Sequence, residues 1–320
     1  MISTELDAAG VREPSLRAAY QHCRTVNAQH GKTFFLATRL LAPRQRPAVH
    51  ALYGFARGAD DILDDFDART NEERADQLQK LSTRLFNSLV ENRSGDDNPT
   101  LTAVVDTARK YDIGWDLFDD FLASMRMDLT VTDYPDRKSL ERYMYGSAEV
   151  IGLQLLPVLG TVGPREEAAP YAAALGKAFQ LTNFLRDVAE DLDRGRVYIP
   201  QEDLERFGAD PARRRADASW RALMAFEVER NRGLYAEADR GLALLPDASR
   251  RCVGTARRLY AGILDRIEDA GYDVFGERVV VPTWRKAALA GAALGVTAAG
   301  ALRTTPASGG RGASGASHEA

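Results

Sequence analysis

The sequence predicts an all-α protein built as a single bundle of helices. Apolar residues recur at spacings of three and four in almost every informative segment, which is the period of a helix with one buried face. Strand and helix patterns do not alternate as they do in α/β proteins. The one short β-like run, at 279–281, is followed directly by a proline.

Length and composition indicate one globular domain with flexible termini. The chain has 320 residues, of which 45% are hydrophobic and 28% are charged, so it can bury a sizeable core. No linker separates parts of different composition. We expect a flexible N-terminus over 1–15, one helical domain over 16–302, and a disordered tail over 303–320 that is rich in glycine, serine and alanine.

Each expected helix follows from apolar periodicity and from the turn residues that bound it. The first begins near Leu16, and the second runs from Arg46 into an acidic segment, with Leu52 and Phe55 on its apolar face. Asn92 to Pro99 consists of turn residues and is typical of a loop. Further breaks are expected at the prolines of positions 43, 135, 164, 170 and 200. The expected helices cover 16–26, 46–65, 71–89, 100–110, 115–128, 139–159, 171–193, 219–245 and 250–270.

Net charge and cysteine content limit the classes of binding partner and the cellular compartments that fit this sequence. The net charge is −4 and no basic block occurs, so we expect no nucleic-acid partner. Cys23 and Cys252 lack metal-ligand spacing and fit a reducing compartment. The N-terminus has no apolar signal-peptide core, so a cytoplasmic location is expected. Ala287–Leu302 is shorter than the roughly 20 residues of a spanning helix and is expected to be a terminal helix or to lie on a membrane surface.

Two acidic motifs interrupt the apolar helical pattern. The segment at 60–65 holds four aspartates in six residues, and the segment at 187–191 again pairs two aspartates four apart. Residues four apart share one face of a helix. Two such helices can hold divalent cations between them, and carboxylate oxygens are ligands that suit Mg²⁺.

The geometry of a helix leaves two choices in the first motif. Either Asp60 with Asp64 or Asp61 with Asp65 can face a cleft, because adjacent residues lie about 100° apart around the axis. The alternative for both motifs is a solvent-exposed acidic surface, which is the commoner role of a charge run.

Basic and bulky apolar residues accompany the motifs. Arg57 lies three residues before Asp60, and Arg186 directly precedes Asp187. Each arginine can pair with the carboxylates or bind phosphate oxygens that metals leave free. The long helices also carry large apolar side chains. These side chains form either ordinary core or a channel for an isoprenoid tail, and the aromatic faces among them can stabilise a carbocation. These residues are Phe34, Phe35, Tyr53, Tyr143, Val150, Phe179, Leu181 and Phe184.

Four anchor sequences combine these features in one order along the chain. They are HGKTF at 30–34, YGFARGADDILD at 53–64, YMYGSA at 143–148, and QLTNFLRDVAED at 180–191, which continues into RGRVYIP at 194–200. Together they resemble the squalene/phytoene synthase family of head-to-head trans-isoprenyl diphosphate synthases, most of all its bacterial members of the actinobacterial type. The resemblance runs from about His30 to Val281 and implies an isoprenoid synthase bundle around a central cavity.

The resemblance also implies roles for individual residues. Asp60 and Asp64 match the first metal-binding pair, Asp187 and Asp191 match the second, and all four count as catalytic. The other catalytic residue implied is Tyr143, near the reacting carbons, and the other metal ligand is Asn183. The residues implied to bind diphosphate or prenyl chains are His30, Thr33, Phe34, Tyr53, Arg57, Ala148, Gln180, Arg186, Tyr260 and Arg278. Many relatives have serine at the positions of Gly31 and Thr33, and Thr33 can replace one of those hydroxyl groups.

The reaction implied is a head-to-head condensation of two prenyl diphosphates through a cyclopropylcarbinyl diphosphate. Two or three Mg²⁺ ions, or Mn²⁺ in their place, assist departure of diphosphate. The expected substrate is geranylgeranyl diphosphate and the expected product is phytoene, formed without NADPH and passed to a phytoene desaturase. The alternative is a C15 substrate that gives squalene, dehydrosqualene or hydroxysqualene.

Two other classes of protein fit the sequence less well. An inactive helical homologue that serves in assembly is disfavoured because both acidic motifs are intact. A head-to-tail prenyltransferase or a terpene cyclase would also use Mg²⁺ and diphosphate on an α-helical fold. The anchors around Tyr143 and at 180–191 argue against it.

Overall fold

The computed structural model of the protein describes residues 2–64, 69–93 and 97–276. Within these ranges the chain is helical, and the one strand-like contact is an isolated β-bridge between Asp133 and Val197. The all-α prediction is therefore confirmed. Arg278, the run at 279–281, the segment at 287–302 and the tail at 303–320 lie outside the described residues.

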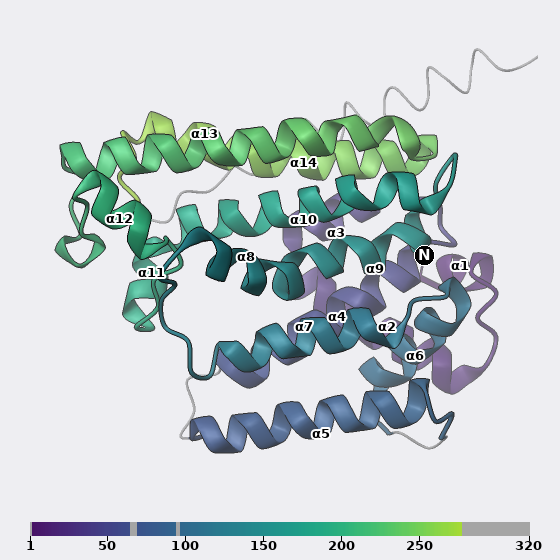
Figure 1. Cartoon of the computed structure of the whole chain (residues 1–320). Helices are drawn as coiled ribbons and strands as arrows, with labels where there is room; N and C mark the ends of the chain where they lie inside the picture. Colours follow the sequence, from purple (N-terminus) through teal and green to yellow (C-terminus); the bar gives the residue numbers. More distant parts are fainter. Residues whose placement is uncertain (1, 65–68, 94–96, 277–320) are drawn as a thin grey trace, which may run out of the picture.

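Fourteen α-helices occur in the described ranges (Figure 1). The predicted helix at 71–89 is confirmed at both ends, as α5. None of these helices is long and apolar enough to cross a membrane. The helices are α1 (Ile2–Ala8), α2 (Pro14–His30), α3 (Lys32–Thr38), α4 (Arg46–Asp64), α5 (Asn71–Leu89), α6 (Pro99–Tyr111), α7 (Trp115–Met127), α8 (Arg137–Met144), α9 (Val150–Leu159), α10 (Arg165–Arg186), α11 (Val188–Asp193), α12 (Gln201–Phe207), α13 (Ala218–Gly241) and α14 (Asp247–Asp269).

Several helices begin where the sequence supplies a capping side chain. Thr70 accepts the N–H of Glu73 while the Glu73 carboxylate accepts the N–H of Thr70, which forms a capping box at the start of α5. Asn98, Asp136 and Asp217 accept backbone N–H groups at the starts of α6, α8 and α13. Local sequence therefore determines where these helices start.

The core consists of two main apolar clusters. One joins α2, α4, α6 and α7, and the other joins α8, α10, α13 and α14. α10 packs between α13 and the α8–α9 segment near the middle of the molecule (Figure 1). Tyr143 of α8 belongs to the second cluster, whereas Val150 and Val158 of α9 belong to the first. The α8–α9 segment therefore joins the two halves of the fold.

The helix predicted at 139–159 is interrupted. A π-helical turn at Tyr145–Glu149 joins α8 to α9. A Cβ atom on Gly146 would lie 2.2 Å from the carbonyl oxygen of Asp120 in α7, so glycine is needed for this approach. The prediction of one regular helix is wrong here because the contact comes from a separate helix, which apolar periodicity does not reveal.

Two further boundaries differ from the predictions. Residues 2–8, expected to be flexible, form α1, and Leu6 is 2% exposed in the first cluster. The buried Glu5 carboxylate accepts a hydrogen bond from Arg46 at 2.9 Å, a partner too distant in sequence to be foreseen. α10 begins at Arg165, so Pro170 lies inside it rather than before it. A proline in the second turn removes only one backbone hydrogen bond.

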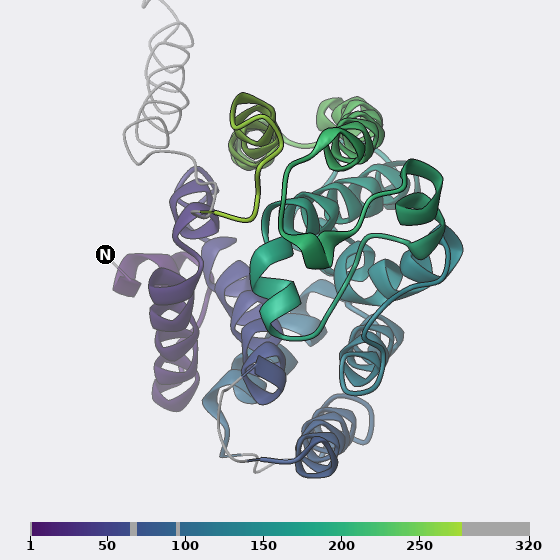
Figure 2. The ribbon, with the colours of Figure 1, turned by 90° about the vertical axis from the view of Figure 1, so that its left-hand side faces the viewer.

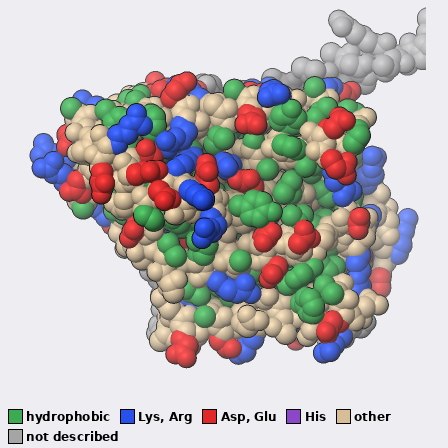
Figure 3. Space-filling model, viewed as in Figure 1, with side chains coloured by type: hydrophobic (Ala, Val, Ile, Leu, Met, Phe, Trp, Pro, Cys, Tyr) green, Lys and Arg blue, Asp and Glu red, His purple; other side chains and the backbone are tan. Residues whose placement is uncertain are grey.

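Charged side chains of both signs are intermixed over the α12 and α13 end of the face in Figure 3, and hydrophobic side chains gather nearer its middle. Three large apolar residues are well exposed, at 43% for Tyr145, 50% for Val90 and 65% for Val162. Single exposed apolar residues of this kind are ordinary on soluble domains.

A buried group of charges fixes α12 against α13. Arg230 donates to Asp203 at 2.8 Å and to Glu227 at 2.7 Å, and Arg137 lies 3.6 Å from Glu227. Glu227 is only 1% exposed. Burial raises the pKa of Glu227 to about 7, although Arg230 and Arg137 oppose the rise.

Glu227→Gln is expected to remove a pH dependence of stability. The pKa of Glu227 in the folded protein lies above its ordinary value of 4.5, so the native state binds the additional proton. The free energy of unfolding must therefore fall as pH rises from about 4.5 to 7. Glutamine is neutral throughout and keeps one donor and one acceptor. In urea unfolding the variant should match the wild type at pH 5 and exceed it by about 2 kcal/mol at pH 8. A variant that is the less stable protein at pH 8 would contradict this assignment.

Candidate active site

The second acidic motif lies at the junction of α10 and α11. Asp187 separates the two helices, and the N–H of Asp191 donates to the carbonyl oxygen of Asp187 at 2.9 Å. The two aspartates are one helical turn apart, as expected, although the predicted unbroken helix is wrong at Asp187. Arg186 holds the Asp187 carboxylate with two donors, Nε to Oδ1 at 2.7 Å and a second N–H to Oδ2. The predicted diphosphate ligand is thus an ion-pair partner in this state.

The polar groups around this junction fit a divalent cation. Burial, and then the negative charge of Asp187, raise the pKa of Asp191 to about 7. One turn before Asp187, the amide oxygen of Asn183 is buried without a hydrogen-bond partner, while its nitrogen donates to Gln180 at 3.4 Å. Carboxylate and amide oxygens are ligands that Mg²⁺ accepts, and the nearby arginines only partly offset the negative charge of the two aspartates. The residues present therefore suit the ion that the resemblance implies.

The first acidic motif forms the end of α4, and Asp64 is the last residue of that helix. Leu52 and Phe55 are buried on the core side, as expected, and Asp60 and Asp61 are half-buried beside them. Arg57 forms an ion pair with Asp61, one turn further along the helix. Asp61 is therefore already neutralised by a protein side chain.

The two motifs lie at the same end of the bundle. The end of α4 and the short helix α11 both lie on the side of Figure 1 that faces the viewer in Figure 2. Within the described part of the chain, no three acidic, histidine or cysteine side chains form a group that could hold a metal.

The turn between α2 and α3 packs against α4. A Cβ atom on Gly31 would lie 2.5 Å from Oδ1 of Asn27 and 2.7 Å from Cζ of Tyr53, so a serine here would require these side chains to move. The predicted binding residues His30 and Thr33 lie on either side of this turn, at the end of α2 and in α3. His30 ends α2 and is exposed, and Thr33 is half-buried in α3.

Phe34 and Tyr260, two predicted binding residues more than 200 positions apart, are in contact. Their ring centres lie 5.1 Å apart, and Phe179 of α10 packs against both, at 5.9 Å from Phe34 and 4.5 Å from Tyr260. Tyr260 also interacts electrostatically with Arg186. An aromatic wall from α3, α10 and α14 therefore adjoins the second acidic motif.

Tyr143 lies in a separate aromatic cluster and is 2% exposed. Its ring centre is 5.5 Å from that of Tyr134, 5.7 Å from Tyr198 and 6.2 Å from Phe184. Its hydroxyl donates to Oδ2 of Asp128 at 2.9 Å. Burial, and then the charge of Asp128, raise the pKa of Tyr143 well above its ordinary value, so the phenol is neutral at physiological pH.

Some residues around Tyr143 had no role assigned from the sequence. Arg196 and Tyr198 belong to the anchor sequence at 194–200, and this membership is a sequence signal by which they could have been predicted as site residues. Asp128 had no such signal, because it lies at the end of a different helix and meets Tyr143 only in the folded chain. The predicted residue Ala148 is buried in the π-helical turn.

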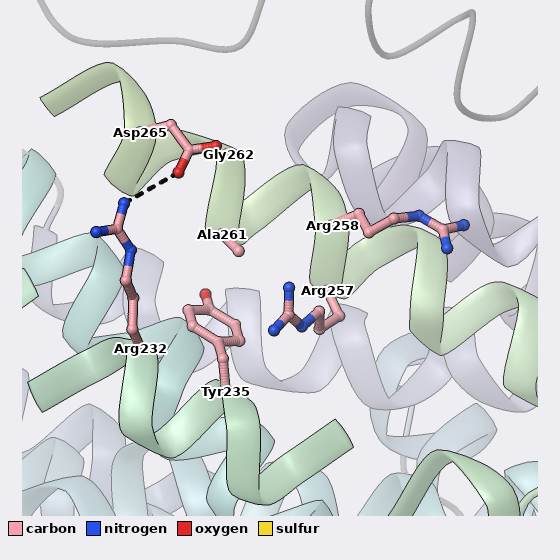
Figure 4. A pocket seen from close by; sticks show the side chains of 7 residues that line it. All are labelled: Arg232, Tyr235, Arg257, Arg258, Ala261, Gly262 and Asp265. Atoms are coloured by element: carbon pink, nitrogen blue, oxygen red, sulfur yellow. Dashed lines mark hydrogen bonds and ion pairs between the residues drawn. The ribbon is translucent and has the colours of Figure 1, made fainter. Parts of the chain in front are cut away.

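Two pockets lie away from the acidic motifs. One, of about 230 Å³, lies among α1 to α4 and includes Phe35 and Arg46. The other, of about 410 Å³, lies between α13 and α14 (Figure 4) and is lined by Arg232, Tyr235, Arg257, Arg258, Ala261, Gly262 and Asp265. Arg232 lies 3.2 Å from Asp265, and Arg257 lies 2.7 Å from Asp239, so carboxylates offset much of the positive charge. Neither pocket contains a motif aspartate.

Comparison with known sequences gives consistent matches over most of the chain. The profile of the squalene/phytoene synthase family matches residues 27–285. The chain is 38% identical over 292 residues to the phytoene synthase of Arthrospira platensis, which covers 86% of this chain and 93% of that protein. It is 40% identical over 286 residues to the 15-cis-phytoene synthase of Synechocystis sp., which covers 85% of this chain and 83% of that protein.

Solved structures show the same fold. A dehydrosqualene synthase in complex with a ligand superposes with a TM-score of 0.79 at 27% identity, over 89% of this chain and 98% of that one. The squalene synthase HpnC from Alicyclobacillus acidocaldarius superposes with a TM-score of 0.74 at 28% identity, over 83% of this chain and 99% of that one.

Proposed function

The chain belongs to the squalene/phytoene synthase family, and we propose that within it this prenyltransferase joins two geranylgeranyl diphosphates head to head to form phytoene. The observation that carries the proposal is the identity of 38% and 40% to two phytoene synthases over most of the chain. The dehydrosqualene and squalene synthases share the fold at 27% and 28% identity. Condensation of C15 substrates is therefore the second candidate.

Asp187, Asp191 and Asn183 would hold Mg²⁺ on one side of the substrate, and Asp60 and Asp64 on the other. Mg²⁺, or Mn²⁺ in its place, supplies Lewis-acid stabilisation of the departing diphosphate when bound. The raised pKa of Asp191 and the unpartnered amide oxygen of Asn183 support this role, because the first indicates unfavourable negative charge at the junction and the second is a buried acceptor without a donor.

The arginines beside the motifs would bind the diphosphate. Arg186 presents a planar pair of donors to the Asp187 carboxylate, and the same geometry fits two phosphate oxygens. Arg57 forms an ion pair with Asp61 through one terminal nitrogen. Gln180, His30 and Thr33 would add further hydrogen bonds to the diphosphate.

The aromatic side chains would protect and stabilise the allylic cation. Phe34, Phe179 and Tyr260 form an aromatic wall, and the faces of such rings attract a cation. Tyr143 and Tyr53 would contact the prenyl chains closer to the reacting carbons. The same walls would exclude the water that otherwise captures a cation as an alcohol.

Incubation of the purified protein with Mg²⁺ and the C15 or C20 prenyl diphosphate tests the substrate directly. We expect a C40 hydrocarbon from geranylgeranyl diphosphate, with no change in yield when NADPH is added. Mass spectrometry of the extracted hydrocarbon identifies the product. A C30 product alone would contradict the assignment and establish the second candidate.

We also propose a cytoplasmic location with contact to a membrane surface and transfer of the product to a desaturase. The support is chemical, because a C40 hydrocarbon partitions strongly into lipid. Flotation of the full chain with lipid vesicles measures this contact. A chain that stays in the dense fraction whether or not it has formed product would count against it.

A further inference from the structure

Asp128 brings together side chains from three parts of the chain. It follows the last residue of α7, and its carboxylate accepts hydrogen bonds from two tyrosines, Tyr143 at 2.9 Å and Tyr198 at 3.3 Å. Its carbonyl oxygen accepts an N–H of Arg196 at 3.2 Å. Each carboxylate oxygen thus serves one phenol, so Asp128 restrains both hydroxyl groups at once.

The same residues connect Asp128 to the second acidic motif. The backbone N–H of Arg196 donates to the carbonyl oxygen of Asp191 at 2.8 Å, while its side chain binds Asp128. The ring of Tyr198 stacks on Phe184 of α10, with centres 4.0 Å apart and planes 8° from parallel. Tyr143, the loop at 194–200 and the second acidic motif are therefore connected through direct contacts.

Resting on the proposed function, we propose that Asp128 is a positioning residue of the condensation, which holds and polarises the Tyr143 phenol. A phenol that donates to a carboxylate carries more negative charge on its oxygen and ring than a free phenol. A ring with more negative charge attracts a carbocation more strongly. Asp128 thus acts on the reaction through Tyr143 and does not itself touch the substrate.

The cluster does not require every phenol to be paired in order to fold. The hydroxyl of Tyr134, whose ring centre lies 5.5 Å from that of Tyr143, is buried with no hydrogen-bond partner. Asp128 itself is only half-buried, so its replacement by alanine opens no sealed cavity. Variants at Asp128 are therefore expected to stay folded, which lets their kinetics be interpreted.

A double-mutant cycle between Asp128 and Tyr143 tests the proposal. Asp128→Ala and Tyr143→Phe should each lower kcat by about 10- to 100-fold and leave KM within about threefold, because the interaction matters in the transition state. The double variant should be no slower than Tyr143→Phe alone. Asp128→Asn keeps an acceptor oxygen without the charge and should fall between wild type and Asp128→Ala.

Asp120→Asn is the matched control, because Asp120 also lies on α7 and hydrogen-bonds a tyrosine, the exposed Tyr145. Its kcat should stay within about twofold of wild type. Multiplied losses in the Asp128→Ala/Tyr143→Phe double variant, or a wild-type kcat in Asp128→Ala, would overturn the proposal. The cycle uses whichever prenyl diphosphate the wild-type protein converts, so an error in the assigned chain length does not affect it.

A second measurement needs no turnover. In protein labelled with ¹³C at the ζ carbon of tyrosine, the resonance that Tyr143→Phe removes belongs to Tyr143. That resonance should move in Asp128→Ala and, to a smaller extent, in Asp128→Asn, and it should not move in Asp120→Asn. An unshifted resonance in Asp128→Ala would refute the hydrogen bond on which the proposal stands, even if the proposed reaction were also wrong.

Discussion

Asp191→Ala is expected to lower the rate of prenyl diphosphate conversion by about 10³-fold or more. Burial and the negative charge of Asp187 raise the pKa of Asp191 to about 7, even though Arg194 and Arg196 oppose the rise. A divalent cation is the natural partner for such a group. Alanine removes one oxygen ligand and leaves Asp187 bound to Arg186, so cation affinity and leaving-group assistance should both be lost.

Initial rates at saturating Mg²⁺, together with calorimetric titration of Mg²⁺ and diphosphate, measure the two effects separately. Asp193→Ala is the control on the same helix, because the Asp193 side chain is 69% exposed and pairs with Arg214. Its rate should stay within about twofold of wild type. Protons and Mg²⁺ compete for Asp191, so the apparent Mg²⁺ affinity of the wild type should fall as pH decreases below 7. Full activity in Asp191→Ala would show that the second motif binds no catalytic metal.

Gly176→Ala should destabilise the protein by about 2 to 3 kcal/mol, although alanine normally favours a helix over glycine. A Cβ atom on Gly176 of α10 would lie 2.3 Å from the carbonyl oxygen of Ala148. Backbone atoms cannot rotate away, so α10 must move from the π-helical turn. Thermal unfolding should show a midpoint lower by about 4 to 12 °C. Because Ala148 is a predicted substrate contact, the variant should also lose activity.

Gly233→Ala on α13 is the matched control, because it is the same substitution in a helix but its Cβ atom would meet no neighbouring atom. Nothing lies within 4 Å of a Cβ atom at Gly233, and the residue is exposed. It should therefore stabilise the protein by about 0.5 to 1 kcal/mol through helix propensity and a less flexible unfolded chain. Equal changes in unfolding temperature for the two variants would rule out close packing as the reason for glycine at 176.

Local sequence was sufficient where the determining contacts are local. The bounds of α5 follow from the spacing of its leucines and from the capping box of Thr70 and Glu73, two residues that lie within one turn of each other. Prediction from local sequence was wrong at the π-helical turn and at α1. Gly146 meets Asp120 of α7, and Glu5 meets Arg46 of α4, and neither partner lies within the range of helical periodicity.

Helical periodicity was enough to predict the fold class, because it is a property of neighbouring residues. The family and the aspartates expected to bind metal were predicted from the resemblance of the four anchor sequences. Other features depend on contacts between distant parts of the chain. Tertiary structure set Phe34 against Tyr260, broke the helix at Asp187, and placed Asp128 on Tyr143. These contacts join helices that are distant in the chain, and they depend on how side chains of particular size and charge pack and pair between those helices.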